Sequence, residues 1–412
     1  MRKNILVVFP HNFFKHTSGI RARFYELMKY FKDRNFKIDL FALKNFESNW
    51  ENQNLHQENL LNKTFFYDFR KGQQEREKRN GIDKKRLDEL PDFAFKSMQD
   101  QFKEILNETH YDYILISYVY WASLIESSII HDSITILDLS DFITLNLFDV
   151  SEGKVNIGKL IEEEIRRVNL FDKVLCISEE ERYFFSQFAL HPDFYYAPFF
   201  MEKKDIMSNF RQRSLFYQFA AHIKYFLISF LENKKKEFLS NSVPKYDILF
   251  IGHDNPHNIK GIKWFFEHVY PLLDDSISML IVGKVSEHVD QFDNVTLLSY
   301  AESLDEIYQE SKISICPLLG GTGMKIKVVE ALAYGLPVVS TSKGVIGLPA
   351  KVNNGCLVAD TPQKFAKLIN KLVSERNYYN EISAIGKQFF LQYFEESRVY
   401  KLLDEIFYTE SL

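Results

Sequence analysis

Short apolar runs of β-strand length alternate with helical patterns along almost the entire chain. The runs are residues 5–9, 37–42, 113–117, 135–138 and 173–178 in the first half, and 247–252, 278–283, 295–299, 313–317, 337–341 and 355–358 in the second. Such alternation predicts parallel sheets whose faces are covered by helices. Because each half starts afresh with a buried strand and a loop, we predict an α/β protein of two Rossmann-like, doubly wound domains facing a cleft.

The same pattern divides the chain into four parts. We predict an N-terminal domain of residues 1–200, an insertion at 201–243, a C-terminal domain of 244–380 and a final segment, 381–412. The last helical pattern runs from about residue 387 to residue 407, and we expect it to be one helix that crosses back to the N-terminal domain.

The insertion carries an amphipathic stripe of phenylalanine, isoleucine and leucine, flanked by basic residues, between residues 211 and 236. One interpretation is a helix whose apolar face packs on the rest of the protein. The other is a basic amphipathic helix that lies on an anionic membrane, which would make this a peripheral membrane protein. Both interpretations stay open at the level of the sequence.

The composition is that of a globular protein and narrows the classes of function. Of the 412 residues, 46% are hydrophobic and 26% are charged, and the net charge of −5 gives no case for nucleic-acid binding. Three cysteines, at 176, 316 and 356, lack the spacing of a disulfide framework or a structural zinc site. No apolar run reaches the roughly 18 residues of a membrane span. We therefore expect a cytoplasmic protein.

The first predicted strand is followed by a loop and an amphipathic helix. The apolar positions that share one face of this helix are Ile20, Phe24, Leu27, Met28 and Phe31. Gly19, just ahead of them, either permits a tight strand-to-helix turn or lets the backbone approach a ligand closely. His11 and Asn12 directly follow the strand, so we expect them to face the cleft as candidate acceptor-binding residues.

The most informative stretch joins two buried strands through a glycine-rich turn and a helix. The turn is Gly320–Gly323, and we expect the helix to open near Thr322 and to end at Gly335, where Pro337 blocks its continuation. The free amides of such a helix start, together with the positive end of its dipole, suit a phosphate or diphosphate.

Charged residues on this helix extend the interpretation from phosphate to nucleoside. Lys325 and Lys327 add positive charge near the turn, and Glu330 lies further along, at a reach suited to ribose hydroxyls. The stretch is not a Walker loop, because no Gly-Lys in it precedes Ser or Thr. It is not a dinucleotide fingerprint either, because Ile326 stands at the third glycine position. One helix could therefore hold a nucleoside diphosphate from phosphates to ribose.

Residues 313–341 as a whole resemble the signature of the group-1, family 4 glycosyltransferases, which have the GT-B fold. Two further segments agree: residues 250–265 resemble the first strand and loop of the family's donor domain, and residues 171–181 resemble the last strand of its acceptor domain. The resemblance spans nearly the whole chain and is strongest at 246–360. It implies that the N-terminal domain binds an acceptor and the C-terminal domain binds a nucleotide-sugar donor.

The resemblance also assigns donor-binding residues. Glu330 matches the second glutamate of the family's Glu-x7-Glu motif, which implies a contact with ribose. The first glutamate, which usually contacts the donor sugar, falls at Thr322, so this chain departs from the family there. Gly321, Gly323 and Met324 complete the turn that would approach the donor.

Two lysines are assigned to the phosphates in the same way. Lys327 would serve the phosphates, and Lys260 matches a family lysine that binds the diphosphate. The arginine that usually accompanies the latter is replaced by His253. The alternatives are a solvated partner of a helix acid for Lys327 and an ordinary surface lysine for Lys260.

Two aspartates follow a predicted strand of the N-terminal domain at the cleft. Asp138 or Asp141 could orient the acceptor hydroxyl or act as a base. Alternatively, Asp141 caps the helix or turn that follows it. Residues 253–257 contain ligand-type side chains, but their Asn and Pro mark a turn, so we expect no metal site.

The resemblance implies transfer of a sugar to a hydroxyl with retention at the anomeric carbon, and with no metal or other cofactor. The acceptor would be a glycan, a lipid-linked molecule or a protein in bacterial surface glycan or glycoprotein synthesis, at the inner face of the membrane. Two alternatives are a nucleotide-sugar epimerase and a non-catalytic module that binds glycan or stabilises a partner enzyme. The lost glutamate at position 322 favours the second alternative.

Overall fold

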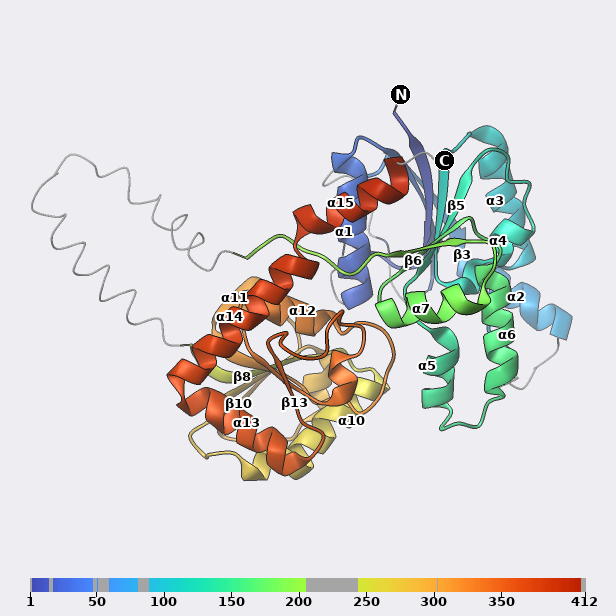
Figure 1. Cartoon of the computed structure of the whole chain (residues 1–412). Coiled ribbons are helices and arrows are strands. Elements are labelled where there is room, and N and C mark those ends of the chain that lie inside the picture. The colour runs from blue at the N-terminus through green and yellow to red at the C-terminus, as the bar shows by residue number, and fades with distance from the viewer. Residues whose placement is uncertain are drawn as a thin grey trace, which may run out of the picture.

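The computed structural model describes residues 2–14, 18–46, 50, 59–80, 89–204, 244–301 and 303–408. Within them, the chain forms two parallel sheets, each flanked by helices (Figure 1). The predicted pair of doubly wound α/β domains is therefore confirmed. The amphipathic stripe at 211–236 lies outside the described residues.

The N-terminal sheet has the strand order β3-β2-β1-β4-β5-β6-β7 within the described residues, and all its pairs are parallel. Its strands are β1 (Asn4–Phe9), β2 (Lys37–Lys44), β3 (Lys63–Asp68), β4 (Tyr113–Ser117), β5 (Ile134–Leu139), β6 (Lys173–Cys176) and β7 (Asp193–Tyr196). The hydrophobic pattern predicted the five inner strands but missed β3 and β7. These two form the edges of the sheet, where half-buried side chains leave no continuous apolar run.

Helices flank this sheet, and the first of them has the amphipathic pattern that the sequence predicted. They are α1 (Gly19–Asp33), α2 (Phe69–Asn80), α3 (Lys96–Glu108), α4 (Ser123–Glu126), α5 (Ile143–Val150), α6 (Ile157–Val168) and α7 (Glu179–Phe188), with a short 3-10 turn at η1 (Val119–Trp121). In α1, Phe24, Leu27, Met28 and Phe31 are buried as expected, because the helical repeat places them on the face toward the sheet.

The C-terminal sheet has the order β10-β9-β8-β11-β12-β13 within the described residues. Its strands are β8 (Tyr246–Ile251), β9 (Met279–Val282), β10 (Val295–Leu298), β11 (Ser311–Cys316), β12 (Val338–Ser340) and β13 (Cys356–Val358). Its helical elements are α10 (Pro256–Trp264), η3 (Phe265–Val269), η4 (Tyr270–Leu272), η5 (Lys284–His288), α11 (Leu304–Gln309), α12 (Ile326–Ala333), η6 (Ser342–Val345) and α13 (Pro362–Ser374). All six of these strands lie at the predicted runs.

The prediction of one final helix is wrong, because the chain forms two, α14 (Arg376–Tyr393) and α15 (Glu396–Tyr408). Extended backbone at Met201 inserts at the break: its N–H donates to the carbonyl of Phe394 at 3.2 Å, and its carbonyl accepts the N–H of Glu396 at 3.1 Å. These bonds replace helical ones and separate α14, which packs on the C-terminal domain, from α15 (Figure 1).

Helix α15 packs against the N-terminal domain beside α1 (Figure 1). Its last carbonyl groups are bound by side chains from that domain. Lys3 Nζ and Tyr113 Oη donate to the carbonyl of Phe407 at 2.8 and 2.6 Å, and Lys173 Nζ donates to that of Ile406 at 2.7 Å. Because the end of a helix leaves such carbonyls without helical partners, these bonds fasten α15 to the N-terminal domain.

Candidate functional site

The glycine-rich loop between β11 and α12 is longer than the sequence predicted. We predicted a helix start near Thr322, whereas α12 begins at Ile326. Gly321 and Gly323 have φ values of +94° and +69°, which a right-handed helix does not accommodate. The predicted helix end is confirmed, because Gly335 has φ +73° and follows the last turn as its C-terminal cap.

The two lysines beside this loop have different surroundings. Lys325 Nζ turns back onto the loop and donates to the carbonyls of residues 321–323, at 2.8–3.2 Å. Lys327 Nζ instead donates to Asn258 Oδ1 on α10 at 2.7 Å and lies 4.4 Å from the centre of the Phe250 ring. Burial lowers the pKa of Lys327 to about 8. Lys325 thus holds the loop in shape, and Lys327 holds α12 against α10.

Glu330 lies one helical turn after Lys327 on α12, so the two side chains share a face. Its Oε2 accepts a hydrogen bond from the Tyr308 hydroxyl at 2.9 Å, and the Tyr308 ring stacks on that of Tyr334 at 4.7 Å. Burial raises the pKa of Glu330, against the opposing effects of this hydrogen bond and of Lys327. The helix therefore places a cation and a carboxyl one turn apart on the same face.

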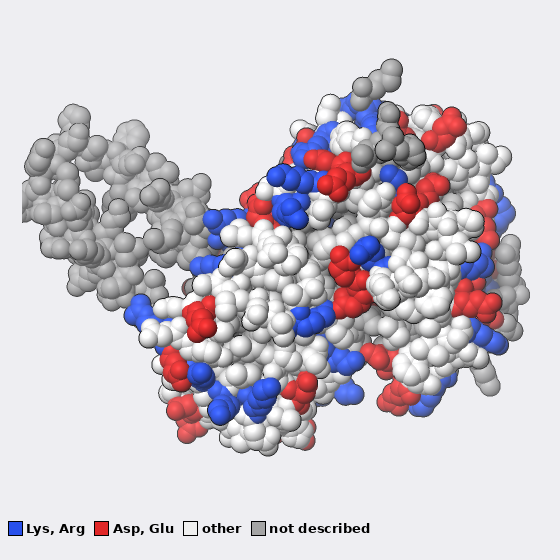
Figure 2. Space-filling view, viewed as in Figure 1, with Lys and Arg blue, Asp and Glu red and all other residues white. Residues whose placement is uncertain are grey.

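The glycine loop contacts the N-terminal domain directly. The N–H of Gly321 donates to Asp149 Oδ2 at 3.1 Å, and the Thr322 hydroxyl donates to Asp141 Oδ1 at 2.5 Å. Nearby, Lys351 forms an ion pair with Glu180. Figure 2 shows acidic and basic side chains gathered where the two domains meet. The connections that follow β5 and β11 thus meet at one junction between the two domains.

Asp138 lies in the core and away from this junction. Its side chain is 0% exposed and forms an ion pair with Arg23 of α1, with 2.6 Å between Oδ1 and Nη1. Oδ2 accepts hydrogen bonds from the hydroxyls of Ser117 and Ser140 at 3.1 and 2.9 Å. Its geometry is that of a buried structural carboxylate, so of the two candidate aspartates only Asp141 meets the opposite domain.

Asp141 directs its carboxyl toward the glycine loop and also accepts a hydrogen bond from Asn146. Burial raises its pKa, while the bond from Thr322 and the charge of Lys325 oppose the change. The alternative role as a cap is filled by another residue. Glu164 of α6 accepts the N–H groups of residues 143 and 144 at the start of α5, both at 2.9 Å.

We expect this cap to make the stability of the protein depend on pH. Burial raises the pKa of Glu164 from 4.5 to about 7, so between these values the folded state binds more protons than the unfolded state. The free energy of unfolding should therefore fall with rising pH in this window, by about 1–3 kcal/mol. Urea unfolding at pH 5 and 7 should show a fall that is larger in the wild type than in Glu164→Gln by this amount. The exposed Glu162→Gln on the same helix should show the same fall as the wild type.

Gly19 lies at the domain junction. A Cβ atom at this position would lie 2.9 Å from Cδ1 of Ile326, the first residue of α12. The absence of a side chain thus lets α1 approach α12. This contact is with the protein itself, so it tests neither earlier interpretation of Gly19, a tight turn or a close approach to a ligand.

His11 and Asn12 lie in the loop after β1. The His11 ring packs against Phe9 and Phe46, with centroid distances of 5.6 and 5.4 Å. Burial, and secondarily the charge of Arg21, lower its pKa to about 4. Asn12 is buried, and its Oδ1 accepts the N–H of Phe14 at 3.1 Å, which shapes the loop.

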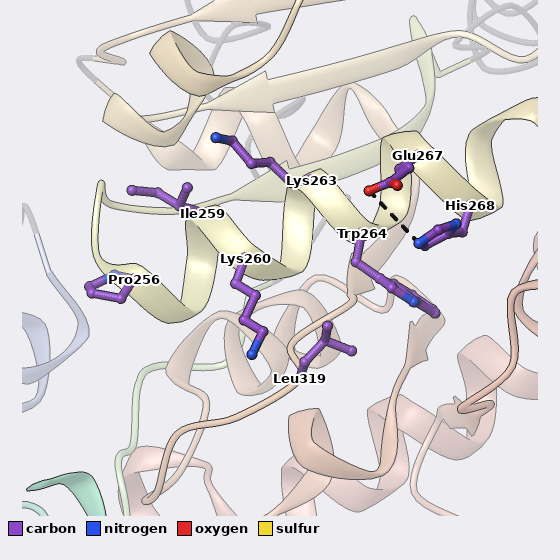
Figure 3. Close-up of a pocket in the computed structure, with 8 residues that line it drawn as sticks. All are labelled: Pro256, Ile259, Lys260, Lys263, Trp264, Glu267, His268 and Leu319. Carbon is purple, nitrogen blue, oxygen red and sulfur yellow. Dashed lines mark ion pairs between the residues drawn. The ribbon is translucent and has the colours of Figure 1, made fainter. Parts of the chain in front are cut away.

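Lys260 lines a pocket of about 620 Å³ beside α10. The lining residues are Pro256, Ile259, Lys260, Lys263, Trp264, Glu267, His268 and Leu319. Figure 3 shows Lys260 extending from α10 toward the loop that carries Leu319, whereas Lys263 points away from that loop. Lys260 thus lies on a different side of α10 from Asn258, the partner of Lys327.

Three residues at the junction were not predicted as parts of the site. Asp149 and Glu181 come from the N-terminal domain, and a Cβ on Gly321 would lie 3.3 Å from the ring of His257. In the sequence, His257 was considered only as a metal ligand, and that role was rejected. A signal for Glu181 existed in Ser178-x-x-Glu, the pattern of a helix start. Nothing in the sequence pointed to Asp149, which meets the glycine loop only through the fold.

The described part of the chain contains no group of three His, Cys, Asp or Glu side chains placed to hold a metal ion. The segment 253–257 accordingly forms a turn and a helix start, in which Asn255 accepts the N–H of Asn258 at 2.9 Å. Among the helices described, none has the length and apolar character to cross a membrane.

The chain is similar to known proteins in sequence and in fold. Residues 245–375 match the model of the family "Glycosyl transferases group 1". The chain is also similar to a Klebsiella pneumoniae protein described as an uncharacterized 44.6 kDa protein in the cps region. The two are 23% identical over 331 residues, which cover 73% of this chain and 76% of the other.

Solved structures share the fold across both domains. Sucrose-phosphate synthase from Thermosynechococcus elongatus superposes with a TM-score of 0.68 at 12% identity, covering 98% of each chain. TarM gives 0.69 at 11% identity, covering 99% of each chain. HepE from Anabaena, in complex with UDP and glucose, gives 0.63 at 13% identity, covering 98% of this chain and 99% of its own. The chain therefore has the GT-B fold, and its residues 245–375 match the family model of the group 1 glycosyltransferases.

Proposed function

We propose that this protein transfers a sugar from a nucleoside diphosphate sugar to a hydroxyl acceptor, with retention at the anomeric carbon. The observation that carries the proposal is the order of groups along one segment of the C-terminal domain. A glycine loop with two positive φ angles is followed by Lys327 and, one turn later, by Glu330. A diphosphate at the loop and a ribose further along α12 would meet these groups in turn.

In this proposal the donor lies between the domains. Backbone amides of residues 321–324 and of the start of α12, where Gly19 lies close to Ile326, approach the donor, with the diphosphate at the α12 end. Lys327 binds the phosphates and Glu330 binds the ribose. Lys260 extends from α10 toward the segment that carries Leu319, and from there it would add positive charge for the diphosphate.

The proposed chemistry depends on stabilising the leaving diphosphate. Negative charge grows on it as the bond to the sugar breaks, and a fixed cation in a water-poor site stabilises that charge. Lys327 is suited to this role, because Asn258 holds its ammonium group in place. Asp141 orients the acceptor hydroxyl, whose proton passes to the leaving diphosphate. We expect neither a metal nor another cofactor to take part.

The proposal for the acceptor rests on proteins to which this chain is similar. One solved TarM structure from S. aureus contains fondaparinux, α-GlcNAc-glycerol and UDP, and the Klebsiella relative is described as lying in a cps region. We therefore propose a glycan, lipid-linked or protein acceptor in bacterial surface glycan or glycoprotein synthesis, used in the cytoplasm at the inner face of the membrane.

A thermal-shift panel of UDP, GDP, ADP and CMP with their sugars tests the donor site first. Selective stabilisation by one nucleotide would support the proposal, because a ligand that binds only the folded state raises its stability. Incubation of that donor with and without acceptors then separates transfer from epimerisation, which needs no acceptor. If no nucleotide shifts the melting temperature, the result favours the non-catalytic alternative over an enzyme that uses a nucleotide sugar.

Replacing Glu330 by glutamine should weaken binding of the nucleoside diphosphate about tenfold, because a ribose hydroxyl loses a charged acceptor. Isothermal titration with the nucleotide selected by the panel would measure this change. Glu310→Gln, at an exposed position of the same domain, is the matched control. Equal affinities for wild type and Glu330→Gln would contradict the assignment to ribose.

A further inference from the structure

Glu181 is a buried carboxyl group that no part of the proposed mechanism uses. It stands in the first turn of α7, where Ser178 Oγ accepts its backbone N–H at 3.2 Å. Glutamate at this place in a capping pattern commonly reaches back to the start of its own helix. Here the residue is only 3% exposed, and among the described residues neither of its carboxyl oxygens has a hydrogen-bond partner.

The carboxyl of Glu181 is directed at the donor loop. A Cβ atom on Gly323 would lie 3.8 Å from Oε1 of Glu181 and 3.6 Å from Oδ1 of Asp141. The two carboxyl groups therefore converge on the same glycine, one from the first turn of α7 and the other from the connection between β5 and α5. Asp141 is already bound to the Thr322 hydroxyl, whereas Glu181 has hydrogen-bonding capacity left over.

Charged groups on several elements surround this carboxyl. Burial and repulsion from Asp141 raise the pKa of Glu181, with a smaller contribution from Glu164 of α6, while Arg23 of α1 and Ser178 oppose them. Lys325 also interacts with it from the donor loop. A buried polar group without a partner destabilises the fold, so its presence at a junction of two domains points to a ligand that completes its hydrogen bonds.

The surroundings also select which part of the donor it meets. At the Gly323 end of the loop, two carboxyl groups are poor partners for the negative charge of a diphosphate, but they suit hydroxyl groups that donate and accept hydrogen bonds, so the diphosphate belongs nearer the start of α12. We propose that Glu181 binds a hydroxyl group of the transferred sugar when the donor occupies the glycine loop. This inference rests on the proposed function, and it makes Glu181 a residue that positions the sugar rather than one that holds the phosphates.

The test compares a nucleotide with its own sugar conjugate. Dissociation constants are measured for UDP, GDP, ADP and CDP and for their glucose conjugates, and the pair that binds the wild type most tightly is used. Glu181→Ala should leave the affinity for the nucleoside diphosphate within about twofold but weaken that for the sugar conjugate about 10- to 100-fold. Glu181→Gln should retain part of the difference, because an amide still forms hydrogen bonds with a hydroxyl.

The matched control is Glu179→Gln, in the same helical turn, where Glu179 pairs only with Arg182 of its own helix in the contacts described. It should change neither affinity. Melting temperatures report folding separately, and we expect Glu181→Gln to be at least as stable as the wild type. Equal loss for both ligands, or no loss for either, would overturn the inference while leaving the proposed function intact. A wild type that binds none of the eight probes overturns both.

Discussion

Replacing Lys327 by alanine should lower kcat for sugar transfer by about 100-fold while the protein stays folded. A fixed positive charge interacts more strongly with the leaving diphosphate in the transition state than in the ground state. Its removal should therefore lower mainly kcat. Burial sets the pKa of Lys327 to about 8, so the wild type should also lose kcat/KM as the pH rises above this value and the ammonium loses its proton.

Steady-state kinetics from pH 6 to 10 would measure both effects. In Lys327→Ala the decline above pH 8 should disappear, because the ammonium group assigned to it is absent. Lys364→Ala removes an exposed lysine of the same domain, on α13, and should behave as the wild type does. Unchanged kcat in Lys327→Ala would remove this residue from the chemistry.

Replacing Asp138 by asparagine should lower the free energy of unfolding by about 3–5 kcal/mol. The reason is the guanidinium of Arg23, which is 2% exposed and would be left in the core without its charged partner. Urea unfolding monitored by circular dichroism would measure the change. A large loss would mark Asp138 as a structural residue and leave Asp141 as the aspartate that serves the acceptor.

A double variant separates the ion pair from other effects of the substitution. Arg23→Met combined with Asp138→Asn removes both charges, so it should be more stable than Asp138→Asn alone. If Asp138→Asn instead unfolds like the wild type but loses activity, Asp138 acts in the chemistry despite its burial.

The strands and the donor segment could be predicted from the sequence because their signals are local. A buried parallel strand needs a continuous apolar run, and the runs at 5–9 and 313–317 correspond to β1 and β11. The end of α12 was marked by Gly335 and Pro337 within a few residues of each other. The beginning of α12 was misplaced because a glycine permits a turn as readily as a helix start, and the choice depends on φ angles that packing sets.

The break between α14 and α15 shows the opposite case. The apolar pattern continues through Phe394, so it favoured one helix. Met201, which is distant in sequence, forms hydrogen bonds with the backbone there and interrupts the helix. Hydrogen bonds between distant segments leave no trace in local periodicity. The same limit hid the two edge strands, whose burial depends on what covers them.

The sequence by itself determined two α/β domains, the glycine loop and the charged helix that follows it, because each depends on neighbours along the chain. Only the tertiary structure decided which carboxyl groups reach that loop. Asp138 and Asp141 are three residues apart, yet one is paired in the core and the other meets Thr322 across the domain junction. Asp149 and Glu181 join Asp141 at the loop from separate helices. Which side chains share a site is set by the packing of whole domains, in which residues distant in sequence become neighbours.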